Sequence, residues 1–402
     1  MDLTEIRSRF PSLERQINGR HVIYFDGPGG SQVPASVTES ISRHMLQSNA
    51  NASPNFATGQ ETIQLVSEVR NKVASFLNCS INEVSFGQNM TSLTFAFSRS
   101  LAQTWNEGDR IIVSEMDHDA NISPWLLAAK ERGVEVKVIP FDPSKATIDV
   151  DDIVPLLNDR TKLVAITLSS NLIGSQVNIS AFCEKVHNAG ALVFVDATHH
   201  AAHHRIDTQE LGCDLLVCSA YKFFGPHIGV LYGRTNVMEK LVPYKIDPAP
   251  TSSPNCWETG TQNFAAIAGL GAALDYILAV GGEGNKDYSV SFAKIEELEQ
   301  NLSEHFLHRL NGLNGFILHG VQTIENRSPT FAVTSEKAKP EELAKFLGGQ
   351  GIFVWNGHMY AVRLVDALGL KREEGVLRIG LMHYNTVEEI DSLFDLLIYK
   401  YE

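Results

Sequence analysis

Residues 191–227 read ALVFVDATHHAAHHRIDTQELGCDLLVCSAYKFFGPH and contain two short apolar runs, each leading to a reactive side chain. The run 192–195 ends at Asp196, and the run 215–218 is followed closely by Lys222. Apolar runs of this length, bounded by polar residues, predict buried parallel strands. Ligands bind at the carboxyl ends of such strands, so Asp196 and Lys222 are candidates for one site.

A carboxylate and a lysine on neighbouring strands suit pyridoxal phosphate (PLP). The lysine amine forms a Schiff base with this cofactor, and the carboxylate keeps its pyridine nitrogen protonated. The same two residues also fit a structural role, because many strands end in Asp and a Lys side chain can lie along apolar surface.

Three more polar residues, Thr91, His118 and Asn171, each follow a predicted strand within a few positions. Thr91 stands between a predicted strand, 83–86, and a predicted helix, 92–102. The free amides of a helix start bind anions, although Thr91 alone would equally serve as an N-cap. We expect the five strand-end residues to meet at one edge of a sheet.

The motifs Asp196-Ala-Thr-His199 and Ser219-Ala-Tyr-Lys222-Phe-Phe-Gly225-Pro226 resemble cofactor motifs of the class V aminotransferase and cysteine desulfurase family, within PLP fold type I. The match recurs from about Tyr24 to Asn385. The resemblance implies an α/β fold: a large domain with a mostly parallel sheet sandwiched by helices, plus a smaller α+β C-terminal domain. We expect an N-terminal segment over 1–20 that packs on the small domain, a PLP-binding domain over 21–263, and a small domain over 264–402.

The resemblance also assigns roles to particular residues. Lys222 is implied to carry the Schiff base and to act as general acid and base, Asp196 to hold the pyridinium charge, and His118 to stack on the ring. These three are the expected catalytic residues. The full expected set of cofactor-binding residues is Met90, Thr91, His118, Asn171, Asp196, His199, Ser219, Tyr221, Lys222 and Thr261.

Two further segments resemble substrate and subunit contacts of the family. Arg378, in LRIGLMHYNT, matches an RxSLxxYNT motif whose arginine pairs with the substrate carboxylate. The segment 257–263, WETGTQN, resembles an EAGTPN motif, which implies a homodimer in which Thr261 reaches the cofactor of the other subunit. The expected substrate-binding residues are Gly29, Gly30, Tyr360 and Arg378.

The segment 351–361, GIFVWNGHMYA, departs from the family. Its counterpart in group II cysteine desulfurases reads approximately RTGHHCA, with a nucleophilic cysteine where this chain has Tyr360 and an arginine where it has Trp355. A phenol cannot carry a persulfide. We therefore expect a lyase that eliminates a β-substituent, such as a C–S or C–Se bond, without a cysteine persulfide. An aminotransferase, a racemase or epimerase, and a non-catalytic PLP-binding regulatory protein are the alternatives.

The histidines of 196–204 form two pairs at helical spacing, His199 with His203 and His200 with His204, a pattern that metal sites use. No acidic ligand accompanies them at that spacing, so we expect no metal. The resemblance places His199 at the cofactor, and we expect the other three histidines in a loop or at the substrate mouth.

Composition limits the classes of partner and the cellular compartment that we expect. The 33 basic and 47 acidic residues give a net charge of −14 without an acidic block, which excludes nucleic acid as an expected partner. The five cysteines are odd in number and have no CxxC spacing, which is typical of reduced thiols. The charged N-terminus and the absence of a long apolar run predict no signal peptide and no membrane span, hence a cytoplasmic protein.

Some predicted elements need the structure as a check. We expect an amphipathic helix over 2–16 and another helix over 150–158. The strands expected in the small domain are 316–318, 330–333, 352–354 and 376–379.

Overall fold

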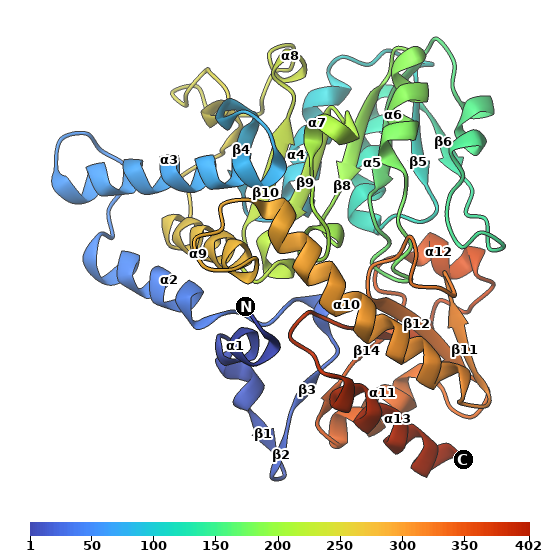
Figure 1. Cartoon of the computed structure of the whole chain (residues 1–402). Helices are drawn as coiled ribbons and strands as arrows, with labels where there is room; N and C mark the ends of the chain where they lie inside the picture. The colour runs from blue at the N-terminus through green and yellow to red at the C-terminus, as the bar shows by residue number, and fades with distance from the viewer.

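A computed structural model, which describes residues 1–402, is built around a seven-stranded sheet (Figure 1). Its order is β4-β10-β9-β8-β7-β5-β6, and only β10 runs antiparallel to its neighbours. Because β10 reverses direction between β4 and β9, the other six strands all point the same way. The strands are β4 (Val84–Gly87), β5 (Arg110–Ser114), β6 (Glu135–Ile139), β7 (Thr161–Thr167), β8 (Leu192–Asp196), β9 (Leu215–Ser219) and β10 (Gly229–Gly233).

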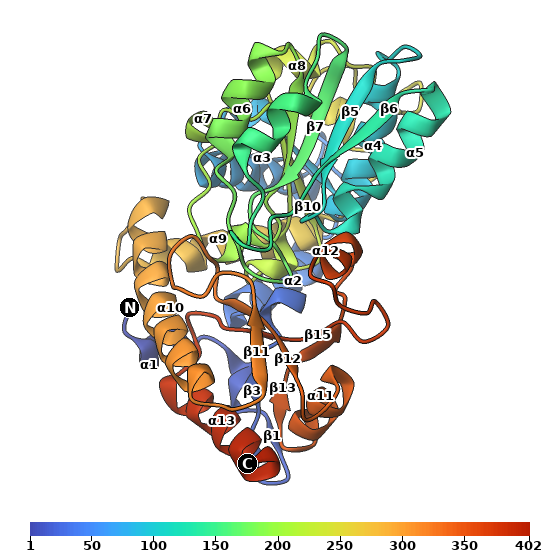
Figure 2. The same ribbon diagram turned by 90° about the vertical axis from the view of Figure 1, so that its right-hand side faces the viewer.

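Helices cover both faces of this sheet, because its strands are apolar on both sides. Along β7, Val164 and Ile166 belong to one buried cluster, while Leu163 and Ala165 belong to another. The first cluster joins α3 (Ala57–Leu77), α6 (Ile179–Asn188) and α9 (Phe264–Val280), and the second joins α4 (Met90–Ala102) and α5 (Ser123–Arg132). Figure 2 shows α5 and α6 on opposite sides of the sheet. This layered arrangement is the one that parallel sheets require.

A second sheet forms the smaller, C-terminal part, at the lower right of Figure 1. Its order is β11-β12-β15-β14, all antiparallel. The elements here are β11 (Phe316–His319), β12 (Thr330–Ser335), α11 (Pro340–Gly349), β14 (Trp355–Gly357), α12 (Val362–Ala367), β15 (Val376–Gly380) and α13 (Val387–Tyr401).

The helix α10 (Tyr288–Asn311) joins the two parts. Its first half contributes Phe292 and Ile295 to the core of the large sheet, and its second half contributes Phe306 and Leu310 to the core of the small one. The helix α10 therefore packs into the cores of both sheets.

The chain ends also connect the two parts. The strand β3 (Ile23–Tyr24) pairs in parallel with β13 (Ile352–Phe353). The N-terminal segment buries Phe10 against Tyr276 of α9 and Tyr384, which follows β15. The helix α9 itself packs on α2 (Ala35–Gln47) and α3. The division of the chain at residue 264 stays a prediction.

Several predicted elements differ from the structure. The helix expected over 2–16 is a shorter α1 (Leu3–Ser8) and a 3₁₀ turn, Pro11–Glu14, because Pro11 cannot continue an α-helix. The helix expected over 150–158 is a 3₁₀ helix, Val150–Leu156, with Pro155 inside it. The strand expected over 352–354 pairs with β3 instead of the small sheet.

Two further short helices are α7 (Thr208–Leu211) and α8 (Thr235–Met238). Near the N-terminus, β1 (Gln16–Ile17) and β2 (Arg20–His21) form a hairpin. None of the helices is both long and apolar enough to cross a lipid bilayer.

Candidate active site

A cavity of about 670 Å³ lies where the carboxyl ends of the large-sheet strands face the small sheet. Cavities of about 300–1,000 Å³ hold small molecules and cofactors. Its lining comes from segments far apart in sequence: Gly29, Asn89, Met90, Thr91, Ser92, His118, Thr167, Ser169, Asn171, Asp196, Thr198, His199, Ser219, Tyr221, Lys222, His227, Trp355, Met359, Tyr360 and Arg378.

The structure brings most of the predicted site residues to this cavity. Two do not line it. Gly30 lies behind Gly29, where a Cβ would come 3.4 Å from the ring of Tyr221. Thr261 is exposed and lines two other cavities, of about 600 and 440 Å³.

One side of the cavity, which we call the sheet-edge wall, consists of His118, Asn171, Asp196, His199 and Lys222. Asp196 is the last residue of β8 and is 5% exposed, and one carboxylate oxygen accepts a hydrogen bond of 2.9 Å from the amide of Thr198. Burial raises the pKa of the Asp196 carboxyl. A buried carboxylate of this kind is stabilised by a cationic partner.

Lys222 follows β9 in a short 3₁₀ turn, and its amine donates to the carbonyl of Pro28. Burial, together with the positive charge of Arg378, lowers the pKa of the Lys222 amine to about 7. A neutral fraction of the amine is therefore present at neutral pH, and only a neutral amine can act as a nucleophile or accept a proton.

Arg378 enters from the opposite side, on β15, and is 4% exposed. Its Nη1 donates to the carbonyl of Asn171 at 2.9 Å, and its Nε is buried without a partner. Burial lowers the pKa of Arg378 only to about 10, partly because Asp26 opposes the change, so the guanidinium stays charged. An unpartnered, charged guanidinium edge is suited to a carboxylate ligand.

The anion turn before α4 differs in detail from the prediction. The N-cap is Asn89, whose side-chain oxygen accepts from the amide of Ser92 at 2.9 Å, so Thr91 lies inside the first turn instead of opening the helix. The amide of Met90 already donates to Ser219 Oγ at 2.9 Å. The hydroxyl of Thr91 has only the Met90 sulfur as acceptor, at 3.3 Å, and is free to bind a ligand.

His118 follows β5 and caps a 3₁₀ turn, since its Nδ1 accepts from the amide of Ala120 at 3.0 Å. Burial lowers the pKa of His118 to about 4, so the ring is neutral and its face can pack on a flat ligand. Behind it, the buried Asp117 accepts from Asn121 at 2.7 Å and from Ser114. Burial raises the pKa of Asp117 to about 8, which keeps that carboxyl uncharged next to Asp196.

The outer rim of the cavity, which we call the aromatic mouth, consists of Trp355 and Tyr360. Trp355 pairs with Arg378 across β14 and β15, so the two side chains lie on the same face of the small sheet. The indole also covers Gly29, where a Cβ would come 2.4 Å from its Nε1. Any larger residue at position 29 would displace the indole.

The comparisons with known proteins agree with this geometry. Residues 23–393 match the model of the family described as aminotransferase class V. The chain belongs to the class V aminotransferase family.

Its relatives include cysteine desulfurases over their whole length. A cysteine desulfurase of Klebsiella pneumoniae is 32% identical over 97% of this chain and 96% of its own, and a probable cysteine desulfurase of Halalkalibacterium halodurans is 31% identical over 98% and 96%. The apo structure of a cysteine desulfurase from Thermococcus onnurineus NA1 has a TM-score of 0.91 at 24% identity, covering 99% and 98% of the two chains. The structure of the cysteine desulfurase CsdA from Escherichia coli has a TM-score of 0.87 at 26% identity, covering 99% and 98% of the two chains. The predicted PLP fold type I is confirmed, and the chain is a PLP-dependent enzyme.

The cavity fits the cofactor that this family uses. Buried polar atoms at the cavity have no partner within the chain: Asn171 Oδ1, Thr198 Oγ1 and Arg378 Nε. Unpartnered buried groups are rare in folded proteins and point to a polar ligand. A pyridinium would give Asp196 its missing cation, and the Lys222 amine stands at the same edge.

Several lining residues escaped the sequence analysis: Asn89, Ser92, Thr167, Ser169, Thr198, His227 and Met359. Thr167 is the last residue of β7, and Ser169 lies between it and Asn171, so their position after this strand could have identified them. His227 stacks on Tyr221, with ring centroids 4.9 Å apart and planes 9° apart. Nothing in its local sequence distinguishes His227 from a surface histidine.

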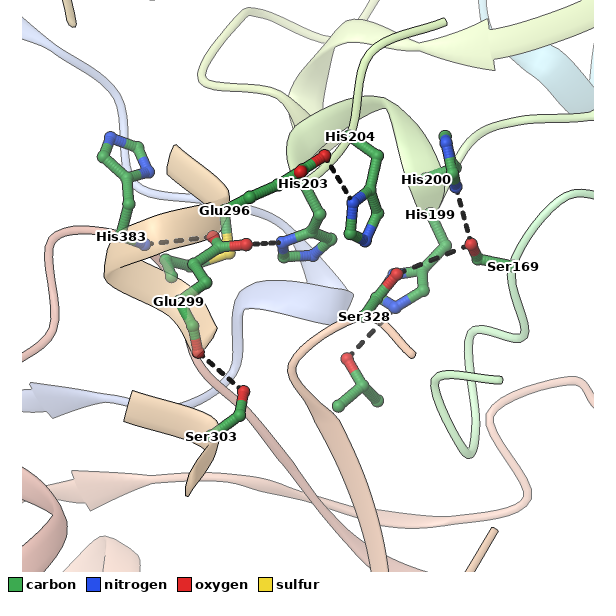
Figure 3. A network of polar contacts seen from close by, with 12 residues as sticks. Ser169, His199, His200, His203, His204, Glu296, Glu299, Ser303, Ser328 and His383 are labelled. Atoms are coloured by element: carbon green, nitrogen blue, oxygen red, sulfur yellow. Dashed lines mark hydrogen bonds and ion pairs between the residues drawn. The ribbon is translucent and has the colours of Figure 1, made fainter. Parts of the chain in front are cut away.

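The other three histidines of 199–204 do not line the cavity; of the two places expected for them, they lie in the loop segment after β8 and not at the substrate mouth. Figure 3 shows His203 and His204 directed towards glutamates of α10, and His200 directed towards Ser169, which follows β7. His203 Nδ1 lies 2.9 Å from Glu299, His204 Nδ1 lies 2.9 Å from Glu296, and His200 Nδ1 lies 2.7 Å from Ser169 Oγ. No group of three histidine, cysteine or carboxylate side chains is arranged to hold a metal ion.

This cluster fixes the segment that begins at Asp196. Glu299 also accepts from the amide of His383 at 3.1 Å, and His199 Nε2 lies 3.0 Å from Thr330 Oγ1 on β12. The segment after β8 is therefore tied to α10 and to the small sheet.

Proposed function

We propose that the chain cleaves a β-substituted amino acid by elimination at PLP and releases the leaving group without a protein-bound persulfide. The observation that carries this proposal is a cavity with an acid, a lysine and an arginine but no thiol. None of the five cysteines lines it.

The five thiols are also poor nucleophiles where they stand. Four are buried, and Cys79 is partly buried. Burial raises the pKa of Cys79 and Cys183 to about 12, and it raises the pKa of the other three as well. The thiolate is the reactive form, so none of them has the properties of a sulfur acceptor.

The wall residues take the following roles. PLP supplies an electron sink for the carbanion formed when an amino acid loses its α-proton. Lys222 anchors the cofactor and moves that proton at its Nζ, for which a pKa of about 7 is well matched to neutral pH. Asp196 holds the positive charge on the pyridine nitrogen, and the neutral ring of His118 packs on the cofactor face.

The other residues orient substrate and cofactor. Arg378 receives the α-carboxylate through its free Nε edge, and Gly29, which has no side chain, lets the indole of Trp355 pack close to the backbone. The hydroxyl of Thr91 takes part in holding the phosphate, as do nearby groups of the anion turn. Asn171, His199, Ser219 and Tyr221 surround the ring.

The test is to give the PLP-loaded enzyme L-cysteine, trap thiols with an alkylating agent and analyse peptides by mass. We expect sulfide and pyruvate but no persulfide, either on 351–361 or on any cysteine. A persulfide on one of the five cysteines, formed and consumed at the rate of turnover, would restore the desulfurase mechanism. Amino-group transfer to a keto acid, or loss of the optical activity of the amino acid, would favour the aminotransferase or racemase alternative.

We also propose a homodimer in which Thr261 completes the phosphate site of the partner. Thr261 lies on an exposed segment away from its own cavity, which supports this role. The segment is anchored by Glu258, which pairs with the buried Arg70 at 2.6 Å. The mass in solution and PLP affinity of Thr261→Val test it: a monomer with full PLP affinity would contradict it.

A further inference from the structure

The aromatic mouth leaves a large apolar surface exposed beside a polar cavity. Trp355 is 50% exposed and Tyr360 is 66% exposed, whereas the other three tryptophans, Trp105, Trp125 and Trp257, are at most 7% exposed. Covering the face of an aromatic ring removes a large apolar area from water, which is favourable, and aromatic rings pack well against one another. The mouth therefore has unused capacity to bind an apolar group of a ligand in the cavity.

The phenol of Tyr360 is held at the cavity by a constrained backbone. Met359 and Tyr360 have φ of 48° and 59°, a left-handed conformation that side chains rarely adopt. Three contacts enforce it: the Met359 carbonyl accepts from Asn171 Nδ2 at 2.8 Å, the Tyr360 carbonyl accepts from the amide of Asp119 at 2.8 Å, and the Tyr360 amide donates to His358 Nδ1 at 3.0 Å. Strain maintained by the surroundings is typical of ligand sites.

The charges of the cavity decide what kind of side chain it accepts. Its only lysine, arginine and carboxylate are Lys222, Arg378 and Asp196. In the proposed function these three are already used by the cofactor and by the α-carboxylate of the substrate. No lysine, arginine or carboxylate of the lining is left to pair with a charged substrate side chain, and the aromatic mouth offers it apolar surface instead. The lining therefore favours an uncharged substrate side chain.

The absence of a thiol limits the leaving group. Without a nucleophile to take the sulfur, the β-substituent must leave as an anion that is stable by itself. Hydrosulfide, the leaving group of cysteine itself, meets this condition, and so does a thiolate bearing an aromatic ring, because the ring delocalises the charge. The same ring has the shape and polarity that the aromatic mouth can cover.

We propose that the substrate is a thioether amino acid, an S-aryl cysteine or a close relative, whose ring is bound by Trp355 and Tyr360. This rests on the elimination chemistry proposed above. The α-proton moves to Lys222 Nζ, the electron pair left at Cα forms the Cα–Cβ double bond, and the Cβ–S bond breaks with its pair on sulfur. The thiolate takes up the proton and leaves as a thiol, and water converts the remaining 2-aminoacrylate to pyruvate and ammonia.

The main experiment compares S-phenyl-L-cysteine with S-methyl-L-cysteine on the PLP-loaded enzyme, by release of thiol and pyruvate. We expect the phenyl substrate to have the higher kcat/KM. Trp355→Ala should lower kcat/KM for the phenyl substrate about tenfold, because the phenyl ring loses its contact with the indole. The same variant should change kcat/KM for the methyl substrate less than about threefold. Tyr399→Ala, which removes an aromatic ring that is 86% exposed on α13, is the control and should change neither.

The outcomes separate the two proposals. Equal kcat/KM for both thioethers, unchanged in Trp355→Ala, would overturn the substrate class but leave the elimination intact. No thiol from either would overturn the proposed function.

A binding measurement tests the substrate class even if the enzyme releases no thiol from either thioether. L-phenylalanine has no leaving group, so its binding to the PLP-loaded enzyme reports the mouth alone. Trp355 is the exposed tryptophan, and its fluorescence should change on adding L-phenylalanine, at lower concentrations than L-alanine requires. Trp355→Phe should lose this signal. Equal affinity for the two amino acids would overturn the inference independently of any chemistry.

Discussion

The sheet-edge wall and the aromatic mouth face the same cavity but are built in opposite ways. The wall stands at the ends of buried parallel strands, and Asp196 and His199 are each 5% exposed. The mouth stands on β14 and the loop after it, and its two rings are half exposed or more. One region is fixed by the core of the fold and the other by a few hydrogen bonds at the surface.

This difference separates two kinds of function. Cofactor chemistry depends on charges held at fixed positions in a dry environment, which only a packed sheet edge provides. Choice of substrate depends on the shape of the opening, which a short strand and loop can change without disturbing the core. Changes in the wall should therefore affect every substrate, and changes in the mouth should affect some.

Removing the lysine of the wall should have the largest effect. Lys222→Ala should lower turnover of every substrate by about 10⁴-fold or more, because both the anchor and the proton carrier are lost. Unfolding temperature should barely change, since the Lys222 amine makes one hydrogen bond, to the carbonyl of Pro28, and otherwise lies over the ring of Tyr221. Visible absorbance of lysine-bound cofactor and product release measure the effect. Lys72→Ala, at a surface pair with Asp275, is the control, and persistent absorbance in Lys222→Ala would mean that another lysine is the anchor.

Neutralising the acid of the wall should have the next largest effect. Asp196→Asn should keep PLP bound but lower turnover by about 100-fold, because a neutral amide does not hold the charge of the pyridine nitrogen. If turnover of S-phenyl-L-cysteine and of S-methyl-L-cysteine falls equally, Asp196 acts on the shared cofactor chemistry, as expected of a residue of the sheet-edge wall. Turnover at the level of the unchanged enzyme would contradict the assigned role.

The pKa of Lys222 predicts a smaller effect of pH. Burial lowers this pKa to about 7, so the amine is mostly protonated below that pH and mostly neutral above it. Uptake of PLP by the cofactor-free enzyme should therefore be about tenfold slower at pH 6 than at pH 8, following the neutral fraction. Stopped-flow absorbance measures the rate, and a rate that falls as the pH rises would contradict the low pKa.

A change beneath the mouth should have the smallest and most selective effect. Gly29→Ala places a Cβ 2.4 Å from Trp355 Nε1, so the indole must move. Overpacking of this kind is worth about 1 kcal/mol, which corresponds to roughly a fivefold rise in the KM of S-phenyl-L-cysteine. Cofactor absorbance should stay as it is. A comparable rise for S-methyl-L-cysteine would show that the two regions are not separable.

The sequence predicted the wall far better than the mouth, and the reason is physical. Strands buried on both faces appear as continuous apolar runs, so β8 and β9 were predicted to within one residue at each end. The strand β14 carries Trp355, Asn356 and Gly357, which show no such pattern, and it was missed. The break in the N-terminal helix, by contrast, has a local cause in the sequence, Pro11.

Contacts between distant segments escaped prediction for another reason. The partners of His203 and His204 are Glu299 and Glu296, on a helix about 90 residues further along the chain. Local sequence contains no sign of which acid meets which histidine. The same holds for Asp117, whose burial beside Asp196 follows from the pairing of β5, β7 and β8.

The pairing of β3 with β13 has a consequence for synthesis of the chain. Ile23 and Tyr24 are made long before their partners, Ile352 and Phe353. The loop that carries Gly29 follows β3 directly and rests on Gly380, where a Cβ would come 2.0 Å from Pro28. All seven strands of the large sheet and Lys222 precede residue 234. Arg378 and the last strand that closes the substrate pocket, β15, come more than 140 residues later, so in a growing chain the strands that carry the wall exist before the mouth and the arginine do.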